Sequence, residues 1–157
     1  MSRLNLAEGC HIVNICPPKD MNGAAYDSDV WSMKNFAHAT IIVQLGVTGA
    51  ASTLKVQACD DFVPTNTTDL AFNIYKEETD SGDTLGARTA VASTGYSTST
   101  NNSIFYVIEV DAEELSASTY SCMRITLSDP AAATLVSAVA ILSGQRFAGD
   151  QNATAIA

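Results

Sequence analysis

The sequence predicts an all-β protein that folds as a single antiparallel β-sandwich, jelly-roll-like in type. Short runs of alternating or β-branched residues recur along the chain, turn residues separate them, and no segment keeps the 3.6-residue period of a helix. At 157 residues the chain is long enough for one domain and short of two. Strands of this kind bury their apolar sides by packing as two sheets over one core.

The strongest strand signals lie at residues 39–47, 104–110 and 134–142, which are rich in β-branched and aromatic side chains. Residues 39–47 are nearly all apolar, which predicts a central strand covered on both faces. Weaker or alternating patterns predict five more strands, at 10–16, 54–59, 70–75, 87–94 and 120–127.

The segments between these strands have their own signals. Pro17 and Pro18 are expected to end the first strand, and residues 17–37 to form a long connection. Asp111 is a candidate N-cap for one helical turn after the strand at 104–110. The chain therefore divides into an extended N-terminal arm (1–9), a β-sandwich domain (10–147) and a loose C-terminal tail (148–157).

The charge pattern argues against several classes of partner. The formal net charge is -9, and the 8 Lys and Arg residues are scattered, so no basic patch can form for nucleic acid phosphates or an anionic membrane. The first residues lack the apolar run of a signal peptide, and no stretch approaches the ~20 apolar residues of a membrane span. We therefore expect synthesis in a cytoplasm and no direct contact with nucleic acid or membrane.

The four cysteines are expected to be free, buried or half-buried thiols, because a cytoplasm is reducing. They are Cys10, Cys16, Cys59 and Cys122. No CxxC pair is present, and the spacing of Cys10 and Cys16 is not a standard zinc spacing. His11 follows Cys10 directly, but adjacent residues of a strand point to opposite faces and do not readily chelate one ion.

Motifs of catalysis are missing from the sequence. It contains neither a GxSxG elbow nor a GxxxxGKS loop, and His38, at the mouth of an apolar strand, is interpreted as a structural histidine. The acidic pairs Asp80-x-x-Asp83 and Asp27-x-Asp29 could ligate calcium, although solvated turns account for them better. We expect no catalytic residue, no metal and no cofactor.

Four segments resemble small structural proteins of tailed bacteriophages, the head decoration or capsid cement proteins. They are Asp29-Val-Trp-Ser-Met-Lys-Asn-Phe, Gly46-Val-Thr-Gly-Ala-Ala, Val56-Gln-Ala-Cys-Asp-Asp and Ser137-Ala-Val-Ala-Ile-Leu-Ser-Gly-Gln-Arg-Phe147. The resemblance extends from about residue 20 to 147 and rests on strand and turn sequences. It implies a non-enzymatic β-sandwich that is made in the host cytoplasm, binds the exterior of an expanded head and cements neighbouring major capsid proteins. Its implied partners are the major capsid protein and further copies of itself.

Two alternatives remain beside this interpretation. One is another phage virion β-module, such as a head fibre, a tail component or a glycan-binding domain. The other is a small β-sandwich enzyme or a cupin, which two distant His residues argue against.

A cement protein would need apolar anchors, and the predicted irregular segments carry six. These candidate capsid contacts are Leu4, Leu6, Trp31, Met33, Phe36 and Phe147. For Trp31 and Phe36 the alternative is that they close the bottom of the domain's own core.

Overall fold

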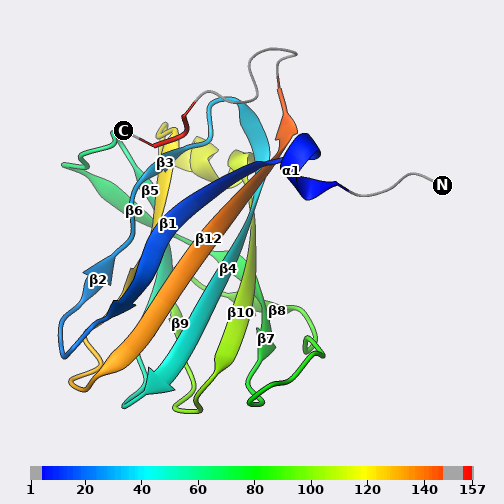
Figure 1. Cartoon of the computed structure of the whole chain (residues 1–157). Helices are drawn as coiled ribbons and strands as arrows, with labels where there is room; N and C mark the ends of the chain where they lie inside the picture. The colour runs from blue at the N-terminus through cyan, green and yellow to red at the C-terminus, as the bar shows by residue number, and fades with distance from the viewer. Residues whose placement is uncertain (1–4, 147–153, 157) are drawn as a thin grey trace.

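The protein is a sandwich of two antiparallel β-sheets, which confirms the predicted fold class (Figure 1). The computed structural model describes residues 5–146 and 154–156. In the view of Figure 1 the strands β1, β12, β4 and β10 cross the front, and β3, β5 and β6 lie behind them. Among the described residues, no helix is long and apolar enough to cross a membrane.

The front sheet, here called sheet A, has the strand order β1-β12-β4-β10-β7-β8. All its neighbouring strands are antiparallel. Its strands are β1 (His11–Asp20), β4 (Phe36–Thr48), β7 (Phe72–Glu77), β8 (Thr89–Val91), β10 (Ile104–Asp111) and β12 (Thr134–Gln145).

The second sheet, sheet B, has the order β2-β11-β5-β6, with β3 also pairing with β11 and β9 with β5. Its strands are β2 (Tyr26–Asp27), β3 (Trp31–Ser32), β5 (Thr53–Cys59), β6 (Thr67–Leu70), β9 (Tyr96–Ser97) and β11 (Cys122–Leu127). β2 and β3 lie within the segment 17–37, which we expected to be one long connection. That expectation was wrong because two short pieces of the segment pair with β11.

The first strand does not end at the two prolines. β1 continues through Pro17 and Pro18 to Asp20, with register shifts against β12 between Asn14 and Cys16 and again between Cys16 and Lys19. Proline has no N–H group and cannot donate a ladder hydrogen bond. β1 accommodates the two prolines because it is an edge strand with one partner and is bulged in this region.

The strand expected at 70–75 is divided between the two sheets. β6 ends at Leu70 in sheet B and β7 begins at Phe72 in sheet A, so the chain crosses the sandwich at Ala71. Alternation continues across this corner, because Leu70, Phe72 and Ile74 are all buried. The alternation of apolar residues in the sequence therefore did not indicate the change from sheet B to sheet A.

Two short helices complete the described chain. The α-helical turn α1 (Leu6–Gly9) lies in the segment expected to be an extended arm and has no buried residue. The 3₁₀ helix η1 (Ala112–Ala117) follows Asp111 as expected, but the Asp111 side chain makes no capping hydrogen bond. Its carboxylate contacts the His38 ring instead, at 2.7 Å.

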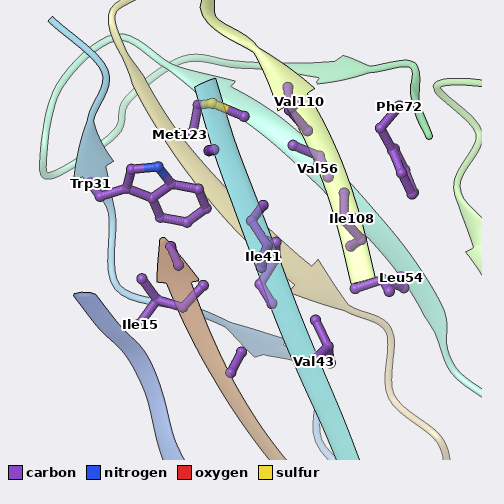
Figure 2. Packing of buried hydrophobic residues seen from close by; sticks show 14 of the residues in the cluster. Ile15, Trp31, Ile41, Val43, Leu54, Val56, Phe72, Ile108, Val110 and Met123 are labelled. Carbon is purple, nitrogen blue, oxygen red and sulfur yellow. The ribbon is translucent and has the colours of Figure 1, made fainter. Parts of the chain in front are cut away.

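The core lies between the two sheets. Figure 2 shows Ile41 and Ile108 of sheet A projecting toward Val56 and Met123 of sheet B, and all four side chains are fully buried. Along β10, and along β4 from Ala39 to Leu45, every second residue faces this core, as the pleat of a strand requires. The other side of sheet A faces away from the core.

Candidate interaction surface

Three of the six candidate contacts belong to the protein's own core. Trp31, Met33 and Phe36 are 0%, 2% and 6% exposed and are part of the main buried cluster. Trp31 lies beside Ile15 at one end of that cluster (Figure 2). The alternative interpretation, in which Trp31 and Phe36 close the core, is sufficient to explain these positions. A role for the three residues in binding a capsid protein stays a prediction.

The other three candidates lie at or near the two ends of the chain. Leu6 is on α1 and is 42% exposed, so its side chain is available to a partner. Leu4 and Phe147 lie outside the described residues. Of the four candidates that the structure describes, three are buried in the core and only Leu6 is exposed, so these four do not form one surface.

A different group of apolar residues lies on the outer side of sheet A, beside polar residues of the same strands such as Thr40, Gln44 and Ser137. Its central row runs across four neighbouring strands through Tyr75, Val107, Ile42 and Val139, each directly opposite the next. All four side chains are half-buried, and none carries a charge. Side chains on one face of adjacent strands lie close enough to form a continuous patch.

Further apolar residues extend this row in two directions. Ile141 on β12 lies opposite Ile12 on β1, which is 50% exposed. At the other end, Phe105 and Leu135 border a shallow hollow of about 460 Å³. We call the whole surface the apolar face; it consists of Ile12, Ile42, Tyr75, Phe105, Val107, Leu135, Val139 and Ile141.

The hollow owes its shape to small side chains. Gly46, Ser103 and Ser137 line it, between Phe105 on one side and Leu135 on the other. A Cβ atom at Gly46 would lie 3.1 Å from the Cβ of Leu135, so a larger residue there would press on Leu135. The apolar face is therefore indented at this end, where a protruding side chain could enter.

Sequence reasoning missed the apolar face although its signal was present. The apolar run at 39–47 predicted a strand covered on both sides, but the second sheet covers only one of them. A sequence without helices has no element to cover the other side. Apolar residues on both faces of a central strand, in a chain with two sheets and no helical layer, thus indicate a surface that no described element of the protein covers.

The apolar face ends in a charged corner around His38. The His38 Nε2 atom lies 2.6 Å from Glu109 Oε2, and its Nδ1 atom lies 2.7 Å from Asp111 Oδ1. Thr40 donates a further hydrogen bond to Glu109 Oε2 at 2.7 Å. Because ionised carboxylates only accept hydrogen bonds, both ring nitrogens donate, and the ring is held as an imidazolium.

The pKa of His38 reflects two opposed causes. Partial burial lowers it, while the hydrogen bonds and charges of Asp111 and Glu109 raise it and prevail, so the pKa lies above its ordinary value. Neither ring nitrogen is left to accept a proton from a substrate. Both ring nitrogens are thus engaged by carboxylates of the protein itself; that His38 is only structural stays a prediction.

The acidic pairs considered for calcium lie apart from the apolar face. Asp27 forms an ion pair with Arg124 at 2.7 Å. Within residues 5–146 and 154–156, no group of three or more His, Cys, Asp or Glu side chains is arranged to hold a metal ion.

The comparisons with known proteins give little further guidance. No protein family matches the chain, and no curated protein sequence matches it. The fold is similar to that in the crystal structure of the SPBc2 prophage-derived protein YomS, with 11% identity, a TM-score of 0.42, and coverage of 84% of this chain and 92% of that chain. Fold and surface together define a two-sheet β-sandwich whose apolar face is left open by residues 5–146 and 154–156.

Proposed function

We propose that the protein is a non-enzymatic structural protein of a phage virion, which binds the outer surface of the assembled head and cements neighbouring major capsid proteins. The observation that carries this proposal is the apolar face. Contiguous apolar patches on a soluble protein commonly mark a surface that binds another protein. The occupant proposed here is the shell of major capsid proteins.

The residues that resemble phage cement proteins support this choice of partner. The segments that begin at Gly46 and Ser137 lie in or next to β4 and β12, the two strands in the middle of the apolar face. Val139 and Ile141 of the second segment belong to the face itself. The segments that resemble cement proteins and the apolar face therefore involve the same part of the chain.

Cementing is consistent with a broad, weakly indented surface. A shell presents many identical sites, and a protein that touches two neighbouring capsid proteins gains affinity because its second contact forms at high effective concentration. Each contact can then be modest. The net charge of -9 favours a partner whose surface is neutral or basic around the apolar contact.

Co-sedimentation with purified heads tests the proposal. We expect the protein to pellet with expanded heads and to stay in solution with immature ones. The variant Val107→Asp places a charge in the central row, and we expect it to weaken binding by roughly 30-fold, as expected for the loss of a hot spot worth about 2 kcal/mol.

The matched control is Thr126→Asp, which places the same charge on another half-buried β-branched residue, on the outer side of sheet B. We expect it to bind like the unmodified protein. If both variants keep the fold and bind expanded heads as the unmodified protein does, the apolar face is not the attachment surface. If the unmodified protein does not bind expanded heads, the proposed cement function itself is wrong.

A further inference from the structure

Two of the four cysteines lie directly opposite each other in sheet B. Cys59 is the last residue of β5 and Cys122 is the first residue of β11, and the two are register partners in an unbroken antiparallel ladder. Register partners of an antiparallel pair project from the same side of the sheet. Both cysteines are free thiols in this structure.

The backbone spacing of this pair is within reach of a strained disulfide. Further along the same register, Ser128 N–H donates to the Thr53 carbonyl at 3.0 Å, which makes that position a hydrogen-bonded pair. Hydrogen-bonded pairs recur at every second residue, so Cys122 and Cys59 occupy one as well. Their Cα atoms are then about 5.5 Å apart, within the roughly 4.4–6.8 Å span of protein disulfides. The Cβ atoms of a hydrogen-bonded pair are also about 5.5 Å apart, beyond the roughly 3.5–4.5 Å of a relaxed disulfide, so the two strands must draw together and the bond is strained and readily reduced.

The thiols share a small apolar compartment of their own. The neighbouring residues Ala58 and Met123 face the main core, so Cys59 and Cys122 face the outer side of sheet B. There they form a second buried cluster with Val30, against which Phe62 packs. Cys59 is fully buried and Cys122 is 4% exposed, so a reagent reaches Cys122 first.

We propose that Cys59 and Cys122 form a reversible cross-strand disulfide that locks sheet B when the protein meets an oxidised low-molecular-weight disulfide. The Cys122 thiolate attacks one sulfur of the reagent, forms a mixed disulfide and releases one small thiol. The Cys59 thiolate then attacks the Cys122 sulfur and releases the second. Two protein thiols are oxidised, and one small disulfide is reduced to two thiols.

The bond would matter because of what it encloses. The chain between the two cysteines contains β6, β7, β8, β9 and β10, which belong to both sheets. Closing so long a loop restricts the unfolded chain and so stabilises the fold. The disulfide does not require binding to a shell. The oxidised form of the protein would appear outside a reducing cytoplasm.

Burial sets the rate of this reaction. It raises the pKa of Cys59 to about 11 and also raises the pKa of Cys122, so little thiolate is present at neutral pH. The experiment is therefore run at about pH 8.5 with glutathione disulfide as the probe, on the full-length reduced protein. Thiols are counted after denaturation, and the melting temperature is measured before and after oxidation.

Trypsin makes the assignment unambiguous. Cleavage after Lys55, Lys76, Arg88 and Arg124 places Cys59 and Cys122 on separate peptides, while Cys10 and Cys16 share a third, between Arg3 and Lys19. We expect the count of free thiols to fall from four to two, and one linked pair of peptides to contain Cys59 and Cys122. We expect the melting temperature to rise by roughly 2 to 10 °C, less than an unstrained bond would give, and to return on reduction.

Two variants complete the test. Cys16→Ser, at a buried cysteine of β1, should still form the linked peptide and show the rise in melting temperature. Cys122→Ser should show neither. Four remaining thiols, a glutathione adduct on Cys122 without a link, or a link to Cys10 or Cys16 would each overturn the assignment. A Cys59–Cys122 link without a rise in melting temperature would overturn the locking role.

Discussion

The main-chain N–H of Ser32 donates a hydrogen bond to the carbonyl of Ala155 at 2.8 Å. Next to it, Trp31 and Ile156 form an antiparallel bridge, and the Ala155 side chain is buried. The described part of the expected loose tail, residues 154–156, therefore packs on β3. In Figure 1 the C-terminal end of the chain lies beside this strand.

This contact predicts that the end of the chain contributes to stability. The variant Ala155→Asp would place a charge in a buried position and displace the segment from β3. We expect a loss of about 1–3 kcal/mol in the free energy of unfolding, measured by chemical denaturation. Thr154→Asp, at a neighbouring exposed residue, is the control and should change little. Equal stabilities for the two variants would show that the segment does not hold β3.

The fold class and the strongest strands could be predicted from the sequence, because their evidence is local. β-Branched runs identified β4, β10 and β12, and alternation identified β5 and β11. The features that the sequence did not predict depend on contacts between distant segments. A partner strand decides each of these features. They are the pairing of β2 and β3 with β11, the change of sheet at Ala71, and the continuation of β1 past Pro17.

The candidate interaction surface also depends on contacts between distant segments. An irregular segment with apolar residues favours exposed anchors, yet Trp31 and Phe36 are buried because Trp31 lies in β3, which pairs with β11, and Phe36 begins β4. The apolar face could not be assembled from the sequence, since Tyr75, Val107 and Val139 become neighbours only through the register of the sheet.

Trp31 provides a direct test of its role in the core. It is fully buried, so we expect Trp31→Ala to lower the free energy of unfolding by about 3–5 kcal/mol, measured by urea denaturation. Leu6→Ala is the comparison, because Leu6 is exposed on α1, and it should change stability by less than about 0.5 kcal/mol. A Trp31→Ala protein of nearly normal stability would mean that this side chain is not part of the core in solution.

The N-terminal segment should affect binding and leave the fold unchanged. None of the described residues 5–9 is buried, so deleting residues 1–9 removes no core contact that the structure describes. We expect the melting temperature of the free protein to stay within about 2 °C of its original value, while binding to expanded heads falls sharply. Co-sedimentation of the truncated and complete proteins measures the second effect. Equal binding would show that the arm takes no part in attachment.

His38 should make stability depend on pH, and the sign follows from its raised pKa. A pKa that is higher in the folded than in the unfolded protein gives a stabilisation that is fully present below the unfolded value, about 6.5. The stabilisation is lost as the pH rises from there through the folded value. The surrounding acids are Glu109, Asp111 and, from η1, Glu114.

The variant His38→Gln removes this titration and keeps a side chain that can donate a hydrogen bond. We expect the unmodified protein to be more stable than the variant at about pH 5.5, and most of that difference to disappear well above pH 6.5. The difference should not exceed about 1 kcal/mol, because the His38–Glu109 pair is roughly one-third exposed. Chemical denaturation at several pH values measures it, with His11→Gln as the control for the second histidine. A difference that stays constant with pH, or grows as the pH rises, would contradict the assignment of His38 as an imidazolium between two carboxylates.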